Sequence, residues 1–179
     1  MSSPMLPLTG RVALITGASR TNGIGFAVAR RLGRMGAKLF LHGWPSSAET
    51  LVDRGPGPTA VGDALESEGI AVRYAEADFL DPAAPEAIVK VTVDAYGHLD
   101  IVDANDAYLR PDRLETLDAA ELDRHLSINV RGSLMLAKAF AAQHAGRPGG
   151  CVVLMTWGQH LGFYDPDMVS YMVSKGAVH

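Results

Sequence analysis

The sequence predicts an α/β domain in which helices cover both faces of a parallel sheet. Short apolar runs alternate with helix-like stretches along the whole chain, which is typical of strand–helix–strand units. A glycine-rich turn directly follows the first apolar run. The chain has 179 residues, 47% hydrophobic and 20% charged, which suits one globular domain. We therefore expect a single domain over residues 1–179, built as a three-layer α/β/α, doubly wound parallel sheet with right-handed crossovers.

Five strands are expected from apolar runs bounded by turn residues. They cover residues 12–16, 38–42, 71–77, 100–104 and 151–156. Helices are expected over residues 24–35, 59–68, 82–96 and 119–143, and a last one contains Tyr171. Pro82 and Gly97 mark the ends of the third helix, and Asp118 with Glu121 forms a capping pair for the fourth. Residues 54–58 predict a surface loop before the second helix.

Composition excludes several function classes. The net charge is -4, and no block of like charge stands out, so we expect no nucleic-acid or membrane partner. The sequence has neither a signal peptide pattern nor an apolar run near the roughly 18 residues of a membrane helix, which favours a cytoplasmic location. Cys151, the single cysteine, lies in an apolar run and is expected to be a buried structural thiol. The six histidines lack metal-ligand spacing, so no metal site is expected.

The glycine-rich turn runs from Thr16 to Gly25, between the first expected strand and the first expected helix. Gly17 permits a tight turn with φ values that other residues resist. Gly23 and Gly25 allow close approach of the backbone to a pyrophosphate and close packing of helix on sheet. The helix N-terminus would present unpaired N–H groups and a partial positive charge to the phosphates. We therefore favour a dinucleotide-binding turn over a purely structural one.

At this turn the sequence resembles the short-chain dehydrogenase/reductase family, whose fingerprint is Thr-Gly-x-x-x-Gly-x-Gly. Five residues separate Gly17 from Gly23, not three, which resembles a longer variant of the loop. The resemblance implies a Rossmann-type sheet with strand order 3-2-1-4-5. The cofactor-binding residues that it implies are Gly17, Ser19, Arg20, Asn22, Gly23, Ile24, Gly25, Asp78, Phe79, Asn105, Tyr171 and Lys175.

Two positions favour NADP(H) over NAD(H). An acidic residue at the end of the second strand would select NAD, but this position is Gly43. Arg20 could pair with a 2'-phosphate, because a guanidinium matches phosphate geometry. The alternative for Arg20 is a solvated loop charge. His42 and Trp44 could line the adenine side or serve only in local packing.

The segments after the third and fourth strands carry further expected contacts. Asp78 resembles the aspartate that contacts the adenine amine, although it could instead cap a helix, a role that suits Asp81 better. Asn105 matches the second asparagine of the family's Asn-Asn-Ala-Gly segment. Asp103 and Asp106 are unusual beside a nucleotide and would repel its phosphates if they pointed inward.

The catalytic pair that the resemblance implies is Tyr171 and Lys175, which share one helix face at a spacing of four. With the cofactor, Lys175 is expected to lower the phenol pKa and make Tyr171 a better proton donor. The resemblance also implies that Asn129 bends its helix and holds a water of the proton relay. The alternative is a tolerated polar residue in a helix interior.

The catalytic serine of the family has no direct counterpart. Counting 13 residues back from Tyr171 gives Gly158, and one inserted residue gives Trp157. Thr156 is the nearest hydroxyl that could polarise a substrate oxygen, and Gln159 and His160 are nearby donors. Loss of such a donor typically costs about 100-fold or more in rate.

The resulting hypothesis is an NAD(P)H-dependent oxidoreductase that transfers hydride between NADP(H) and a carbonyl or alcohol substrate, similar to 3-oxoacyl or other ketone reductases. A non-catalytic nucleotide-binding module and an inactive fragment that pairs with another chain are the alternatives. The resemblance suggests a homodimer or homotetramer. It also implies that strands six and seven and the substrate lid of full-length members are missing, because the sequence ends just beyond Lys175. The fifth strand would then have an open edge.

Overall fold

The computed structural model describes residues 5–44 and 55–179. Five parallel strands form one sheet in the order β3-β2-β1-β4-β5. The strands are β1 (Val12–Ile15), β2 (Lys38–Gly43), β3 (Val72–Glu76), β4 (Ile101–Ala104) and β5 (Cys151–Leu154). The predicted α/β class, the five strands and their order are confirmed.

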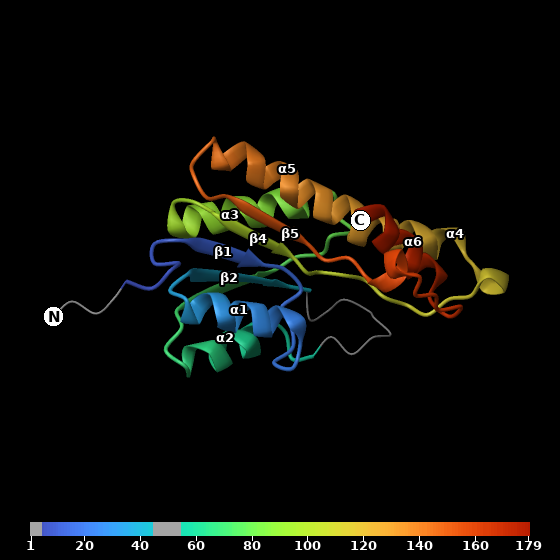
Figure 1. The fold of residues 1–179 in the computed structure, drawn as a ribbon, viewed down its shortest axis with the longest axis horizontal. Helices are drawn as coiled ribbons and strands as arrows, with labels where there is room; N and C mark the ends of the chain where they lie inside the picture. Colours follow the sequence, from blue (N-terminus) through green and yellow to red (C-terminus); the bar gives the residue numbers. More distant parts are fainter. Residues whose placement is uncertain (1–4, 45–54) are drawn as a thin grey trace.

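Helices cover both faces of this sheet (Figure 1). On one face lie α1 (Ile24–Arg34) and α2 (Pro58–Glu66), and on the other lie α3 (Ala84–Tyr96) and α5 (Ser133–His144). Strand residues alternate between two apolar clusters, because successive side chains of a strand point to opposite faces. In β1, Leu14 joins the cluster beneath α3 and α5, and Ile15 joins the cluster beneath α1 and α2.

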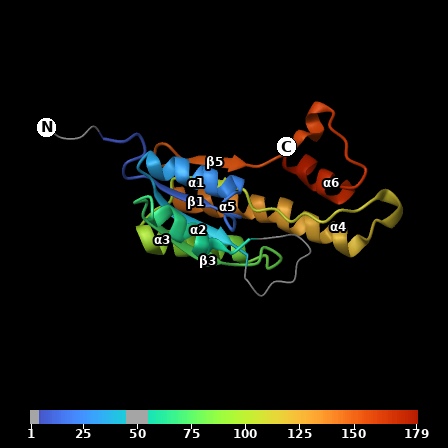
Figure 2. The same ribbon diagram turned by 90° about the horizontal axis from the view of Figure 1, so that it is seen from below.

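The fourth helix, expected over residues 119–143, is present but is divided into segments. The chain forms α4 (Ala119–His125), then a π-helical segment (Leu126–Gly132), then α5. The predicted cap is present, since Asp118 Oδ2 accepts a hydrogen bond from Glu121 N at 3.2 Å. The last helix, α6 (Val169–Val178), packs against α4 and the π-helical segment. Figure 2 shows α4 and α6 together, beyond the ends of the strands.

The prediction of a buried Cys151 is also wrong, because its side chain is exposed. Within the described residues, β5 has β4 as its one hydrogen-bonded neighbour. Val152 and Leu154 face the cluster beneath α3 and α5, whereas Val153, on the face that Cys151 shares, is 42% exposed. An apolar run therefore identified the strand correctly but not which of its residues are covered.

The other element boundaries differ from expectation by one or two residues. Gly97 ends α3 in the left-handed region at φ 83°, as a C-terminal glycine commonly does. Asp81 Oδ1 accepts a hydrogen bond from Ala83 N just before that helix. Arg54, the first residue of the expected surface loop, lies outside the described residues. No helix in the described part of the chain is long and apolar enough to cross a membrane.

Candidate active site

The glycine-rich turn lies where β1 ends and α1 begins. Gly17 adopts φ 67°, and a Cβ atom there would lie 2.7 Å from Asp106 Cα, so only glycine fits without a shift. A Cβ atom on Gly25 would lie 3.1 Å from Ala18 Cα. Asn105 Nδ2 donates to Thr16 O at 2.9 Å and Gly17 O at 3.3 Å. The amide of Asn105 thus fixes the turn from the neighbouring strand.

A pocket of about 390 Å³ opens beside this turn, at the end of the sheet where ligands bind in open α/β folds. It joins the turn to the predicted catalytic pair. Its lining residues are Gly17, Ser19, Arg20, Gly23, Ile24, Trp44, Asn105, Asp106, Ala107, Tyr108, Leu109, Met155, Thr156, Trp157, Tyr171 and Lys175. Most of the predicted site residues are therefore brought together in one cavity.

Five predicted residues do not line this pocket: Asn22, Gly25, Asp78, Phe79 and Asn129. Asp78 Oδ1 accepts a hydrogen bond from Leu80 N at 2.8 Å, so its side chain closes a local turn. The Phe79 ring is 1% exposed and stacks on His42, with the ring centroids 4.3 Å apart. The adenine contact by Asp78 and cofactor binding by Phe79 stay predictions.

The end of β2 has no space for a side chain. A Cβ atom on Gly43 would lie 2.6 Å from Ser19 Oγ and 2.7 Å from Pro58 Cδ. Ser19 is 8% exposed, and its Oγ has no hydrogen-bond partner within the described residues. Arg20 is exposed and lines the same pocket. A buried hydroxyl without a partner and a guanidinium fit a ligand that bears hydroxyl and phosphate groups.

Trp44 and Asp106 form a contact that the sequence did not reveal. Trp44 Nε1 donates to Asp106 Oδ1 at 2.9 Å and connects the segments that follow β2 and β4. Burial lowers the pKa of His42 and of Lys175, and the nearby Asp106 carboxylate opposes both changes. Asp106 lines the pocket, whereas Asp103 does not.

The predicted catalytic pair lies on the first turns of α6. Lys175 is 2% exposed, and its Nζ donates to Met155 O at 2.7 Å and lies 5.8 Å from the centroid of the Tyr171 ring. Burial raises the pKa of Tyr171. Removal of the phenol from water disfavours the phenolate, whereas the expected lowering by Lys175 applies to the site with cofactor bound.

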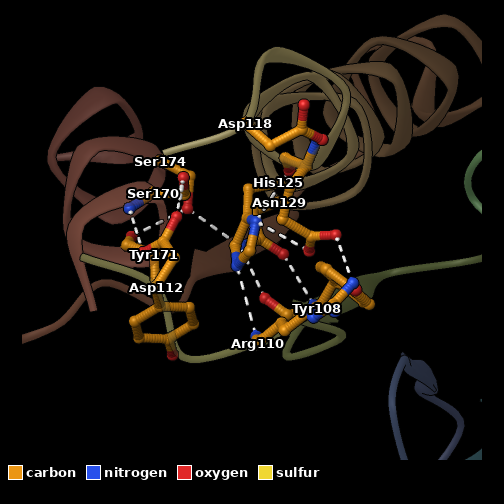
Figure 3. A network of polar contacts seen from close by, with 10 residues as sticks. Tyr108, Arg110, Asp112, Asp118, His125, Asn129, Ser170, Tyr171 and Ser174 are labelled. Atoms are coloured by element: carbon orange, nitrogen blue, oxygen red, sulfur yellow. Dashed lines mark hydrogen bonds and ion pairs between the residues drawn. The ribbon is translucent and has the colours of Figure 1, made fainter. Parts of the chain in front are cut away.

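Asn129 is fully buried in the π-helical segment and connects it to the segment after β4 and to α6 (Figure 3). Its Oδ1 accepts from Tyr108 N at 2.7 Å, and its Nδ2 donates to Tyr108 O at 3.0 Å and to Ser174 Oγ at 2.8 Å. Ser174 Oγ in turn donates to Tyr171 O at 2.8 Å. The side chain therefore has a full set of partners and is more than a tolerated polar residue.

Trp157, one of the two positions to which the count for the family's serine leads, packs against the predicted proton donor. The Trp157 ring packs edge-on against the Tyr171 ring, with centroids 5.3 Å apart and an interplanar angle of 71°. Gly158 begins a short 3-10 helix (Gly158–Leu161) and does not line the pocket. Of the two residues, Trp157 is therefore the one that lies at the pocket. Thr156 lines the pocket and carries a hydroxyl.

A second unforeseen contact holds the start of α6. Asp112 Oδ1 accepts from Ser170 N at 3.0 Å, and its Oδ2 accepts from Ser170 Oγ (Figure 3). Nearby, Arg110 N donates to the buried His125 Nε2 at 3.3 Å. The acceptor and donor residues are far apart in sequence, so no local motif could have indicated these contacts. In the described part of the chain, no cluster of three or more His, Cys, Asp or Glu residues could hold a metal ion.

Comparison with known proteins identifies several relatives. The chain is 33% identical over 173 residues to versicolorin reductase 1 of Aspergillus parasiticus, which covers 96% of this chain and 61% of that protein. It is 30% identical over 171 residues to oxidoreductase UcpA of Escherichia coli K12, which covers 96% of this chain and 60% of that protein.

Solved structures of similar fold and sequence include two short-chain dehydrogenases. A short-chain dehydrogenase/reductase from Serratia marcescens has a TM-score of 0.82 and 30% identity. A short chain dehydrogenase from Burkholderia cenocepacia, in complex with NADP, has a TM-score of 0.82 and 32% identity. Each match covers 96% of this chain and 65% of the other. The chain thus spans less than two thirds of the length of these relatives. Residues 11–179 match the family described as short chain dehydrogenase, and the chain belongs to that family.

Proposed function

We propose that this chain forms the cofactor-binding and catalytic part of an NADP(H)-dependent oxidoreductase that transfers hydride between NADP(H) and a carbonyl or alcohol substrate. The observation that carries the proposal is a single pocket lined by both the glycine turn and the pair Tyr171 and Lys175. A cytoplasmic location and a homodimer or homotetramer belong to the same proposal, on the sequence grounds given above.

The preference for NADP(H) over NAD(H) rests on the end of β2. An aspartate at Gly43 would collide with Ser19 Oγ and Pro58, so the usual NAD-selecting carboxylate has no space there. Arg20 supplies a positive charge in the same pocket. The Burkholderia cenocepacia relative, which binds NADP, also supports this choice.

In the proposed reaction the bound dinucleotide supplies the hydride, and side chains of this protein donate the proton and stabilise the charge that forms. The hydroxyl of Tyr171 donates its proton to the carbonyl oxygen, which becomes negative as hydride arrives. Lys175 places an ammonium group beside the phenol and stabilises the phenolate that forms. Thr156 is the candidate for a second donor to the substrate oxygen. Asn129 holds the helix that carries Tyr171.

A non-catalytic nucleotide-binding module is the second candidate. Two observations favour it: the indole of Trp157, not a hydroxyl, packs against Tyr171, and burial raises the pKa of Tyr171. Both would slow proton donation and leave the glycine turn intact. Turnover therefore separates the two functions, whereas cofactor binding is common to both.

Cofactor binding is tested first, by calorimetric titration of the purified chain with NADPH and NADH. We expect NADPH to bind at least about tenfold more tightly, because one charge-assisted phosphate contact contributes about 1.5–3 kcal/mol. Arg20→Gln should reduce this ratio to near one. Arg34→Gln, a control on the exposed end of α1, should leave it unchanged. Absence of binding to either nucleotide by the folded chain would contradict the proposal.

Turnover is tested by following NADPH oxidation with a panel of ketones. Tyr171→Phe should lower kcat by about 100-fold or more, because it removes the proton donor. The same variant should keep its NADPH affinity within about threefold, since the ring and its packing remain. Equal kcat for wild type and Tyr171→Phe would remove the catalytic assignment, and binding without turnover would favour the second candidate.

A further inference from the structure

Trp157 forms an aromatic wall directly beside the proposed proton donor. Its ring packs edge-on against Tyr171 and also against Phe163, with centroids 4.8 Å apart in the latter pair. Trp157 lines the pocket and is only partly buried, so part of the indole is accessible from the cavity. It is one of the two positions to which the count from Tyr171 leads for the family's hydroxyl donor.

The surroundings of Trp157 are apolar as well. Leu109 and Met155 line the same pocket. Beyond Trp157, the chain exposes Leu161 at 81%, Phe163 at 50% and Tyr164 at 70% of their surface. Large apolar side chains that are exposed together are typical of a binding surface. The walls on this side of Tyr171 thus offer apolar and aromatic contacts.

We propose that Trp157 is a specificity-determining residue and that the substrate is an aromatic ketone whose ring packs against the indole. The inference rests on the proposed function, because that function supplies the carbonyl chemistry. The ketone carbon accepts hydride from NADPH, which leaves as NADP⁺, and the carbonyl oxygen takes the proton of Tyr171 to give a secondary alcohol. Packing on Trp157 orients the ketone by its ring and compensates for the donor that the serine would have provided.

The physical basis is the geometry of aromatic pairs. Rings prefer edge-on or offset-stacked contacts and gain free energy beyond the area that they bury. At an aromatic wall this gain corresponds to a preference of about two- to tenfold for an aromatic ligand over a saturated ligand of the same carbon skeleton. A saturated ring would bury a similar area and gain only the binding free energy that comes from burial of apolar surface.

The test compares 2-acetylnaphthalene with 2-acetyldecahydronaphthalene. Their dissociation constants are measured by equilibrium dialysis with NADP⁺ present, so that no reduction takes place. We expect the naphthyl ketone to bind about two- to tenfold more tightly to the wild-type chain. Trp157→Phe should retain the preference within about twofold, and Trp157→Leu should bring the ratio to about one. A purely structural role of Trp157 would weaken both ketones equally and leave the ratio unchanged.

Tyr74→Leu is the matched control, because Tyr74 is an aromatic residue that is 45% exposed on β3 and does not line the pocket. It should leave the ratio unchanged. A wild-type ratio of one, or an unchanged ratio in Trp157→Leu, overturns the inference, as does failure of both ketones to bind. Reduction of other carbonyl compounds in that case would preserve the proposed function. Conversely, the expected ratio of dissociation constants without any turnover would overturn the proposed function, but Trp157 would remain a binding site for aromatic rings.

Discussion

At the scale of single residues, Asp103 places an ionisable carboxyl group inside the sheet. It is 3% exposed in β4, and neither carboxylate oxygen has a hydrogen-bond partner within the described residues. Burial raises the pKa of Asp103 to about 6. Protonation of Asp103 therefore favours the folded state. This contribution to the free energy of unfolding is complete below the unfolded pKa near 4 and is lost as the pH rises through about 6.

We therefore predict that Asp103→Asn stabilises the chain at pH 8 but not at pH 4. The amide imitates the neutral carboxyl, so the gain at pH 8 should be roughly 2 kcal/mol, and the two proteins should agree within about 0.5 kcal/mol at pH 4. Urea unfolding at both pH values measures the difference. Asp123→Asn, at an exposed position of α4, serves as the control. A gain that is the same at both pH values would show that Asp103 is not the titrating group.

Individual site residues were predictable where the chemistry depends on short-range spacing. Gly17, Tyr171 and Lys175 follow from motifs, and all three line the pocket. The residue beside Tyr171 was not predictable, because one inserted residue in the connecting loop moves the alignment between Gly158 and Trp157. The packing of the two rings shows which of the two residues lies beside Tyr171.

At the scale of elements, the position of α6 depends on a cap from another part of the chain. Asp112 accepts hydrogen bonds from Ser170 N and Ser170 Oγ, at the start of the helix that carries Tyr171. Its carboxylate also lies near the positive end of the helix dipole. A helix of 10 residues is marginal alone, so this cap and the packing on α4 hold it in place.

We predict that Asp112→Ala lowers the free energy of unfolding by about 1–2 kcal/mol, the usual loss for a helix cap. It should also lower kcat more than NADPH affinity, because the helix positions the proton donor. Asp112→Asn keeps one acceptor for Ser170 N and should recover part of both losses. Asp167→Ala removes an exposed ion pair with Arg113 and should cost less than about 1 kcal/mol. Equal effects of Asp112→Ala and Asp167→Ala would argue against the cap.

Elements were predictable to the extent that local pattern determines them. All five strands follow from apolar runs, and their right-handed connections leave few possible orders. The π-helical segment within residues 119–144 was not predictable from periodicity. It coincides with Asn129, whose side chain reaches Tyr108 and Ser174 on two other segments, so its cause lies in tertiary contacts.

At the scale of the whole molecule, the sheet has an uncovered edge strand, β5. Among the described residues, β5 pairs with β4 alone, and Cys151 and Val153 are exposed on one face. An exposed edge strand with apolar side chains is a template for pairing with another chain. Lysine on such a strand opposes this pairing, because two charged edges repel each other and each charge would have to leave water.

We accordingly predict that the purified chain associates with itself as concentration rises, and that Val153→Lys reduces this association. Val91→Lys is the matched control, since Val91 is 44% exposed on α3 against 42% for Val153. Sedimentation velocity from low to high micromolar concentration should show larger species for wild type and Val91→Lys, and fewer for Val153→Lys. A reductant must be present throughout, because the exposed Cys151 could otherwise form a disulfide between chains. Association that is equal in all three proteins would exclude β5 as the contact, and the helical surfaces of α4, α5 and α6 would then be the next place to introduce charge.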